Sequence, residues 1–542
     1  ALPICYTVRN MSYLRRKDFQ RETRNLLTEY SDSSTIHGVK YLGGPRRRLP
    51  ERLWWLLAIA ASFYACGALI INIYRKWSTD PVIVSFSQTP TPLWKIPFPS
   101  VTICPLNKVR QSIFNFTDVL TRLQDDPKSN ITDEDVQQLR ALSLICYSYN
   151  LVHLKNVSGF WSNSTEEYCY RLMAQVVLTE EALFDMFTWK GSSNKTYLSS
   201  IVTEEGLCFV FNMMTNARIF RDDVVYFQQP NSNMASLKSI DWTPEKGYPI
   251  NASLDSFPFR FVNGGTGNSL EIALTTNPTD YDFLCEGPFQ GYNILINTPV
   301  EVPSINGGYI RVPSNQETLI MLKPHMIRTS DKLRAYEPSG RQCYYEAERY
   351  LRYFRVYTQL NCEMECVTNY TLTKCGCIAF HLPRLPGIEI CGPAKYQCYR
   401  DAVEDLNNIA VDGVKGLEAD EETPNCNCLP SCTYLTYDSE ISYGDVSFKG
   451  HYRSNTYFAS GTKENVSYAY IALFFKEDQF ISLVRGELFG KTDFVANCGG
   501  LLGLFMGVSL LSIVEIFYFC TMRLLYRLKE NREIFTDHVH CT

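Results

Sequence analysis

The sequence predicts an α+β membrane protein in which two transmembrane helices flank a large, disulfide-rich extracellular domain. Two long apolar segments lie near the two ends of the 542-residue chain. Fifteen of its 20 cysteines lie between Cys104 and Cys432, and eight Asn-x-Ser/Thr sequons lie between the apolar segments. Disulfides and N-glycans both form on the extracytoplasmic side of a membrane. We therefore expect residues 75–493 to be extracellular.

The first apolar segment follows a polar tail, residues 1–52, that ends in a cluster of arginines at positions 46, 47, 48 and 52. Leu53–Ile73 carries no charge, which predicts a transmembrane helix over residues 53–74. Further basic residues follow the second apolar segment, in the tail 523–542. Because cytoplasmic flanks are enriched in Lys and Arg, we expect both termini in the cytosol.

The second apolar segment, predicted to span residues 494–522, has an unusual composition. Gly499, Gly503 and Gly507 recur every four residues, so they share one helical stripe. Such a stripe is typical of close helix packing. Together with Ser509 and the intramembrane carboxylate Glu515, it instead favours a narrow aqueous pore that attracts cations.

The interval between the apolar segments shows helical and strand patterns in turn. Six prolines indicate extended chain over residues 80–110. Short strands with Gly, Asn and Pro turns are expected over 206–328. Helices are expected in the segments DEDVQQLRALSLICYSY, EEALFDMFTW and Glu346–Cys366, and further strands in TYLTYDSEISY and VSYAYIALFFK.

Composition and motifs argue against several function classes. The net charge of −5 and the lack of a dense basic patch give no sign of a nucleic-acid partner. The Cys spacings could suit zinc, but His is scarce near them, so no metal is expected. The Gly-rich turn at Gly264 lacks the context of a phosphate loop. No GxSxG or HExxH motif and no convincing acid pair is present, so we expect neither an enzyme nor a cofactor.

The sequons mark expected glycosylation sites. A ninth sequon, Asn10, lies in the tail expected to be cytosolic and is predicted to be unused. The eight expected sites are Asn115, Asn130, Asn156, Asn163, Asn194, Asn251, Asn369 and Asn465.

Four segments resemble the degenerin/epithelial sodium channel superfamily, which includes the acid-sensing channels, and the likeness is greatest to its insect pickpocket branch. They are the His-Gly stretch STIHGVKYL, the segment FPSVTIC after the first span, the cysteine array from Cys362 to Cys432, and GLFMGVSLLSIVEIF. The resemblance runs from His37 to Glu515. It implies an ectodomain with a β-sheet palm and β-ball core and a helical finger, thumb and knuckle, the thumb spanning about residues 343–432.

The resemblance also implies a set of disulfides. Cys146 and Cys169 match no pair of the acid-sensing channels and are left as candidates for a bond to each other, with Cys285 unassigned. The implied pairs are Cys104–Cys208, Cys343–Cys432, Cys362–Cys428, Cys366–Cys426, Cys375–Cys398 and Cys377–Cys391.

Roles for single residues follow from the same resemblance. Gly507-Val508-Ser509 occupies the position of the selectivity filter, and His37-Gly38 that of a gating motif in the tail. Pore lining and cation attraction fall to Gly503 and Glu515, and the gate to Ala496, Asn497 and Gly500.

Two departures from the family pattern affect these roles. Tyr518 stands where many acid-sensing members have a second acid, and YEPSGRQC lacks a thumb Trp, so Trp77 is a candidate for coupling the thumb to the membrane.

The resulting prediction is a subunit of a trimeric, amiloride-sensitive, voltage-independent, sodium-selective cation channel in the plasma membrane. An extracellular chemical or mechanical stimulus would gate it, in a sensory role, and its partners would be same-family subunits, the lipid bilayer, sodium ions and amiloride-type blockers. One alternative is an ATP-gated purinergic-type channel, but we find no extracellular Lys/Arg cluster for triphosphate. The other is a two-span scavenger-type lipid receptor, which has no need for the Gly stripe and Glu515.

Overall fold

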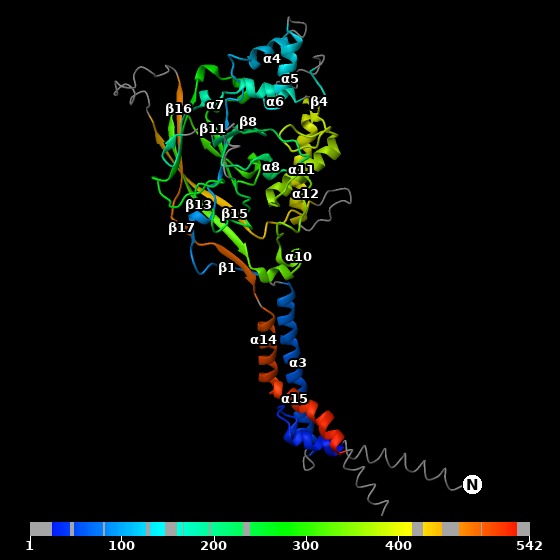
Figure 1. Ribbon diagram of the computed structural model, residues 1–542. Helices are drawn as coiled ribbons and strands as arrows, with labels where there is room; N and C mark the ends of the chain where they lie inside the picture. The colour runs from blue at the N-terminus through cyan, green and yellow to red at the C-terminus, as the bar shows by residue number, and fades with distance from the viewer. Residues whose placement is uncertain are drawn as a thin grey trace, which may run out of the picture. The chain divides into compact units, whose positions relative to one another are not determined.

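The computed structural model divides the chain into two compact units, which are described separately (Figure 1). The larger unit comprises Val84–Asp331 and Gln342–Arg485, and the smaller unit draws on Ala1–Ile83, Lys332–Arg341 and Gly486–Thr542. The residues that the structure describes are 24–43, 48–79, 82–125, 131–146, 160–165, 167–193, 197–230, 239–414, 426–446, 466–488 and 490–527.

Two main β-sheets form the body of the larger unit. The eight-stranded sheet has the order β1-β18-β13-β16-β10-β5-β6, with β15 also paired to β13. Its strands are β1 (Val82–Phe86), β18 (Leu483–Glu487), β13 (Gln316–Thr329), β16 (Ser467–Phe475), β10 (Ser269–Thr276), β5 (Phe184–Trp189), β6 (Ser192–Ser193) and β15 (Tyr434–Asp445).

The six-stranded sheet has the order β12-β11-β3-β8-β7-β9. Its strands are β12 (Ile310–Val312), β11 (Tyr292–Asn297), β3 (Ser100–Pro105), β8 (Gly206–Phe211), β7 (Leu198–Thr203) and β9 (Gln228–Pro230). Two small pairs join β14 (Ile390–Cys391) to β4 (Ser164–Thr165) and β17 (Gln479–Phe480) to β2 (Thr91–Pro92).

The long strand β13 organises the first sheet. It pairs antiparallel with β15, with Ile320 opposite Ile441, and parallel with β16, with Ile320 beside Leu473. Its buried residues alternate, as expected for a strand with one face on the core. By contrast, β3 and β8 are buried along their whole length, which requires cover on both faces.

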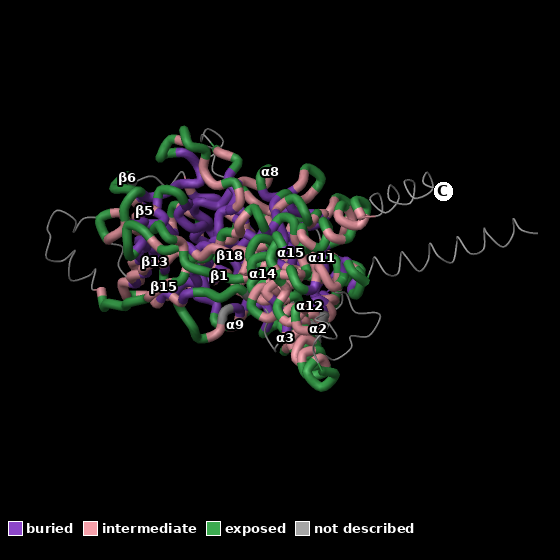
Figure 2. The backbone as a smooth tube through the Cα atoms, turned by 90° about the horizontal axis from the view of Figure 1, so that it is seen from below, coloured by how far each residue is buried: buried purple, intermediate pink, exposed green. Residues whose placement is uncertain are grey.

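Aromatic side chains fill the core next to these sheets. Phe98 makes edge-to-face contacts with Phe261 and Trp189, at centroid distances of 5.2 and 5.1 Å, and Phe211 lies 5.0 Å from Trp189. All four are buried. Such pairs add stability beyond their buried area. Figure 2 shows the buried backbone concentrated in this body, whereas α14 and α15 are mainly intermediate or exposed.

A second core lies among three helices of the larger unit: α4 (Phe116–Asp125), α5 (Asp133–Leu142) and α6 (Tyr168–Val176). The disulfide Cys146–Cys285 ties the chain just after α5 to α9 (Phe283–Glu286). Cys169 is a buried free thiol on α6. The expected bond between Cys146 and Cys169 is therefore wrong: Cys285, far away in sequence, lies closer in the fold.

Two antiparallel helices, α11 (Gln359–Cys375) and α12 (Tyr396–Val414), pack against each other in the cysteine-rich region (Figure 1). Thr358 caps the start of α11, and Gly376 ends it in a left-handed conformation with φ of +75°. Between the helices, the Asp405 carboxylate accepts hydrogen bonds from Lys374 and Tyr370. The structure contains all six disulfides implied by the family resemblance, five of them around this helix pair.

Short helical turns connect the remaining segments of the chain. They are α2 (Lys40–Gly43), α7 (Glu180–Leu183), α8 (Asn216–Ile219), α10 (Pro338–Arg341) and the 3₁₀ turns η1 (Leu93–Lys95), η5 (Pro278–Asp280), η6 (Ile305–Gly307), η7 (Asp331–Ala335) and η8 (Pro393–Lys395).

Two segments expected to be helical are helical only in part. In EEALFDMFTW only Glu180–Leu183 is helical; Phe184–Trp189 is strand β5, because pairing with β10 buries its aromatic side chains. The stretch 346–358 before α11 is irregular. There the backbone N–H groups of Arg352 and Tyr353 donate to the Glu365 carboxylate, a partner that a continuous helix could not supply.

The smaller unit contains three apolar helices: α3 (Leu49–Thr79), α14 (Lys491–Met506) and α15 (Leu510–Tyr518), followed by the π-helical turn η9 (Phe519–Arg523). Among the described helices, α3 is by itself long and apolar enough to cross a membrane, whereas residues 491–506 and 510–527 meet that test only as a pair, bent by 68°. α3 packs along α14, where Trp77 stacks on Phe494 with centroids 5.3 Å apart. Large side chains such as Tyr64 and Leu504, 81% and 77% exposed, leave these helices with uncovered apolar surface.

Candidate pore segment

The break between α14 and α15 is formed by Gly507, Val508 and Ser509, the residues expected to form the selectivity filter. Gly507 has φ of +67° and ends α14, donating its N–H to the Gly503 carbonyl at 2.9 Å. A positive φ of this kind favours glycine. The Val508 N–H bonds back to Leu502 at 3.3 Å, so the last turn of α14 is closed.

Ser509 begins the next helix. It caps α15 with its side chain, which accepts a hydrogen bond from the Ser512 N–H at 3.3 Å. The Ser512 hydroxyl accepts from the Ser509 N–H at 3.1 Å in return. Each residue thus satisfies a donor that a helix start leaves unpaired. The sharp turn is therefore encoded locally, by Gly507 at the end of one helix and Ser509 at the start of the next.

The N-terminal segment reaches this break within the smaller unit. The His37 N–H donates to the Met506 carbonyl at 2.8 Å, one of the acceptors that the end of α14 leaves free. The His37 ring lies so close to Gly507 that an added Cβ there would come within 2.8 Å of it. Gly38 has φ of +88°, and a Cβ on it would lie 2.8 Å from Ile59 of α3. The His-Gly pair thus lies between α3 and the C-terminal end of α14.

Thr35 connects the same segment to Glu515. Its hydroxyl lies 2.8 Å from the Ser512 hydroxyl and donates to the Glu515 carboxylate at 3.0 Å. Glu515, expected to attract cations, is half-buried beside this contact. Neither Thr35 nor Ser512 was expected from the sequence, although Thr35 lies in the His-Gly stretch and Ser509-x-x-Ser512 has the spacing of a capping pair.

Two ion pairs extend these contacts beyond the break. The Glu29 carboxylate accepts hydrogen bonds from Arg523 at 2.8 Å and from Arg527 at 2.7 Å. Beside it, Tyr30 packs edge-on against Phe519 with centroids 5.4 Å apart. Glu29 and Tyr30 lie in a helical stretch, residues 24–33, to which the sequence assigned no role.

The residues expected to form the gate lie on α14. Ala496, Asn497 and Gly500 are all exposed in the isolated chain, and Gly499 and Gly500 have open space where a Cβ would be added. Gly503 lies one turn further along, where its carbonyl holds Gly507. Of the small-residue stripe, Gly499 thus lies on an uncovered helix surface, whereas Gly503 is half-buried and Gly507 lies against the His37 ring. A stripe buried against α3 would have indicated packing within one chain.

Trp77 of α3 lies near Tyr336 of the segment 332–341. The pKa of the Tyr336 hydroxyl is raised by burial and by Glu487, while the nearby Trp77 indole lowers it. The Trp77 N–H is buried and makes no hydrogen bond to the described residues. Trp77, a residue of α3, also stacks on Phe494 of α14. Its indole therefore connects these two helices and lies beside this segment.

Among the described residues, no cluster of His, Cys, Asp or Glu side chains could hold a metal ion. Of the sequons, Asn163, Asn251 and Asn369 are exposed, and Asn115 is half-buried with its side-chain oxygen accepting from the Asp118 N–H at 2.9 Å. The sequons at Asn10, Asn130, Asn156, Asn194 and Asn465 lie outside the described residues.

Comparison with known proteins defines the class. The family model described as amiloride-sensitive sodium channel matches residues 30–519. The chain belongs to this family of membrane channels.

Individual relatives agree with that assignment. Pickpocket protein 28 of Drosophila melanogaster is 30% identical over 91% of this chain and 78% of its own length. The sodium channel protein Nach of the same fly is 22% identical over 95% of this chain and 91% of its own. Acid-sensing ion channel 2 of Rattus norvegicus is 22% identical over 90% and 84%, respectively.

Proposed function

We propose that this chain is one subunit of a trimeric, amiloride-sensitive, voltage-independent channel that conducts sodium across the plasma membrane when an extracellular chemical or mechanical stimulus opens it. The observation that carries the proposal is the break at Gly507–Ser509. It lies between two apolar helices with exposed side chains and is contacted by the His37-Gly38 turn of the N-terminal segment. Irregular backbone at membrane depth is tolerated where it lines a water-filled path.

The proposed assembly follows from the number of apolar helices. Among its described residues, one chain supplies α3 and the bent pair as candidate spans, which cannot enclose a pathway alone. Three copies arranged around α14 would bring Ala496, Asn497 and Gly500 together at the gate, where small side chains allow close approach. The number three comes from the resemblance to the acid-sensing channels.

Oxygen ligands at the break support a sodium path. Sodium is a hard cation, so backbone carbonyls and the Ser509 hydroxyl can replace part of its water shell. Glu515, next to Thr35, supplies negative charge beyond the narrow ring. The channel needs no cofactor, and its permeant ion is Na⁺.

The proposed topology places both termini in the cytosol and the larger unit outside the cell. The seven disulfides of the described residues require an oxidising compartment. The exposed sequons Asn163, Asn251 and Asn369 are then glycosylation sites.

Voltage clamp on cells expressing the chain tests the channel function. Ala496→Val places a bulky side chain on the exposed gate surface and is expected to hold the channel open, giving a sodium current that amiloride blocks. Ala496→Ser is the matched control, since a small side chain should leave the gate closed at rest.

Surface biotinylation of both variants measures how much protein reaches the plasma membrane, so that an absent current can be told from absent protein. Ala496→Val protein at the surface that carries no current, alone or with Pickpocket protein 28, would contradict the proposal. A current evoked only by ATP would instead favour a purinergic-type channel, and uptake of lipid particles without current would favour a scavenger-type receptor.

A further inference from the structure

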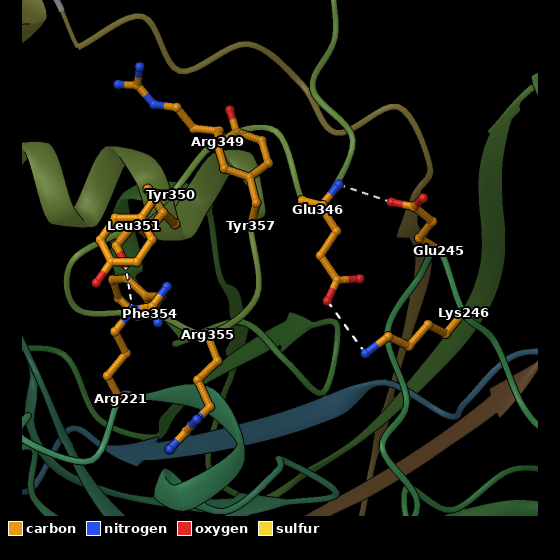
Figure 3. A pocket seen from close by; sticks show the side chains of 11 residues that line it. Arg221, Glu245, Lys246, Glu346, Arg349, Tyr350, Leu351, Phe354, Arg355 and Tyr357 are labelled. Atoms are coloured by element: carbon orange, nitrogen blue, oxygen red, sulfur yellow. Dashed lines mark hydrogen bonds and ion pairs between the residues drawn. The ribbon is translucent and has the colours of Figure 1, made fainter. Parts of the chain in front are cut away.

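A charged pocket in the larger unit shares no residue with the candidate pore segment. Its volume is about 420 Å³, within the range of small-molecule sites. The walls come from the irregular segment 346–357, from Glu245 and Lys246, and from Arg221 (Figure 3). A second hollow of about 520 Å³ is lined by three of the same residues, Lys246, Glu346 and Arg355, so the two adjoin.

Positive charge predominates in the lining. Four cationic side chains, Arg221, Lys246, Arg349 and Arg355, face two acidic ones, Glu245 and Glu346. Two of the cations have carboxylate partners: Arg355 pairs with Asp222 outside the pocket, and Lys246 lies 3.7 Å from Glu346 and 3.1 Å from Asp241.

For the other two guanidinium groups, the hydrogen-bond acceptors among the described residues are backbone carbonyls. The Arg221 Nε donates to the Leu351 carbonyl at 2.7 Å, and the Arg349 Nη2 donates to the Cys426 carbonyl at 3.0 Å. Within the described part of the chain, no carboxylate lies within 4.0 Å of either group. Most of their N–H donors therefore remain available to an anion.

An exposed aromatic ring lies beside the first of these arginines. The Arg221 Cζ is 4.0 Å from the centroid of Tyr350, a cation–π contact. Tyr350 is nevertheless 68% exposed, so much of its surface is open. Figure 3 shows Tyr350 and Arg221 together on one side of the pocket and the Glu346–Lys246 pair on the other.

We propose that this pocket binds an extracellular aromatic carboxylate. The carboxylate pairs with the free N–H donors of Arg221, because a guanidinium fork matches its two oxygens. The aromatic ring stacks on the open surface of Tyr350. Arg349 at the rim adds attractive charge. Two sources have this chemistry: a free aromatic acid, and a peptide whose acidic and aromatic side chains extend into the adjoining hollow.

The position of the pocket gives its occupant a consequence for gating, a step that rests on the proposed channel function. Segment 346–357 lies between Cys343, bonded to Cys432, and the first turn of α11. A ligand that contacts this segment together with Arg221 and Lys246 restricts the motion of the chain at the N-terminal end of α11. Occupancy is then expected to change the probability of opening.

Binding to the purified full-length protein in detergent tests the site without any current. The probes are phenylacetate and the hexapeptide Gly-Asp-Tyr-Glu-Phe-Gly, measured by calorimetry, with phenylacetamide and the Asn/Gln peptide as neutral counterparts. At least one acidic probe is expected to bind about tenfold or more tightly than its neutral counterpart.

Matched variants locate the binding. Arg221→Gln, Arg349→Gln and Tyr350→Ala should each weaken it about fivefold or more, whereas Tyr350→Phe and Arg311→Gln, the latter on β12 outside the pocket, should not. Arg349→Gln leaves the Arg221–Tyr350 stack in place, and thermal unfolding verifies that each variant is folded.

Each outcome supports or overturns a different part of the proposal. Binding by phenylacetate identifies a free acid as sufficient, and binding by the peptide alone identifies a peptide ligand. Failure of both acidic probes, equal binding of the neutral ones, or insensitivity to all three pocket variants overturns the site. Displacement by inorganic sulfate with no effect of Tyr350→Ala reduces it to a simple anion site. Ligand binding without any effect on the current of the channel with native Ala496 removes only the gating step, whereas absence of the Ala496→Val current contradicts the proposed function instead.

Discussion

Gly507 and Gly38 are glycines for two separate reasons, a positive φ and a close neighbour. At each position a Cβ would be strained by the backbone and would also meet a side chain at 2.8 Å, the His37 ring or Ile59. Most helical glycines lack such constraints: Gly499 of α14 has open space around it. The two constrained glycines therefore fix the shape of the break and of the turn that contacts it.

We expect Gly507→Ala to lower the amiloride-sensitive current of the Ala496→Val channel about tenfold or more, because the added methyl displaces His37 and strains the turn. Voltage clamp with surface labelling measures the change. Gly499→Ala, which raises helix propensity at an open position, is the control and should keep the current. An unchanged current in Gly507→Ala would show that the break tolerates a side chain and that the His37 contact is dispensable.

Two carboxyl groups of the larger unit have pKa values shifted in opposite directions. Burial raises the pKa of Glu301, which accepts from the Thr298 N–H at 3.2 Å, and the nearby Glu363 raises it further. Hydrogen bonds from Lys323 and Lys476 lower the pKa of the exposed Glu440 to about 2. Glu301 therefore binds its proton at a higher pH than an ordinary Glu, whereas Glu440 stays ionised far into the acid range.

We expect Glu301→Gln to raise the thermal midpoint by about 1–3 °C at pH 8, since it removes an ionised, half-buried carboxylate. The gain should vanish as the pH falls through the raised pKa, where native Glu301 becomes neutral. Glu440→Gln is the control: it should lower the midpoint by about 1 °C or less at every pH from 5 to 8, because that carboxylate remains charged. Equal gains for Glu301→Gln at pH 5 and pH 8 would refute the assignment.

At the scale of elements, the helices of the larger unit depend on covalent links. The pair α11 and α12 is held by the Cys375–Cys398 bond, and α11 is tied to the segment 426–428 by two more. The group α4, α5 and α6 has its own core and one disulfide, Cys146–Cys285, across 139 residues. Closing so long a loop restricts the unfolded chain strongly.

Removing that disulfide by Cys146→Ser or Cys285→Ser is expected to cost about 2–5 kcal/mol of unfolding free energy. Cys169→Ser should cost less, because Cys169 is a free thiol, and burial raises its pKa to about 12, which makes it unreactive. Thermal unfolding measures the losses, and mass spectrometry of a non-reduced digest identifies the bond. Recovery of a Cys146–Cys169 peptide would contradict the fold of this region.

For the whole molecule, the proposed function requires that a stimulus acting on the larger unit be transmitted to the apolar helices of the smaller unit. Segment 332–341 groups with α3 and α14 in the smaller unit, although it interrupts the larger unit in sequence. Tyr336 of this segment lies near Trp77 and Glu487. We therefore propose that Trp77 and Tyr336 serve the coupling role of the thumb Trp that this sequence lacks.

Trp77→Ala and Tyr336→Ala are each expected to reduce the stimulus-evoked current about fivefold or more, while the constitutive Ala496→Val current persists, because the pore itself is intact. Voltage clamp of each variant, with and without Ala496→Val, separates the two effects. Trp94→Ala, a partly exposed Trp in the larger unit, is the control. Loss of the constitutive current as well would indicate a folding role for the pair and no transmission role.

The sequence by itself determined the features that local chemistry or spacing encodes: the uncharged helix over 53–73, the Gly-x-Ser break, the strand segments, and the cysteine spacing that, through the family resemblance, implied six disulfides. Only the tertiary structure decided what depends on distant partners. Phe184–Trp189 is a strand because it pairs with β10. The stretch 346–358 is irregular, and backbone N–H groups within it donate to the Glu365 carboxylate. The disulfide partner of Cys146 is Cys285 and not Cys169. The Thr35 hydroxyl donates to the Glu515 carboxylate, 480 residues away in the chain. Spacing along a chain fixes neighbours within a turn or a strand, whereas contacts between distant segments depend on how the whole chain packs.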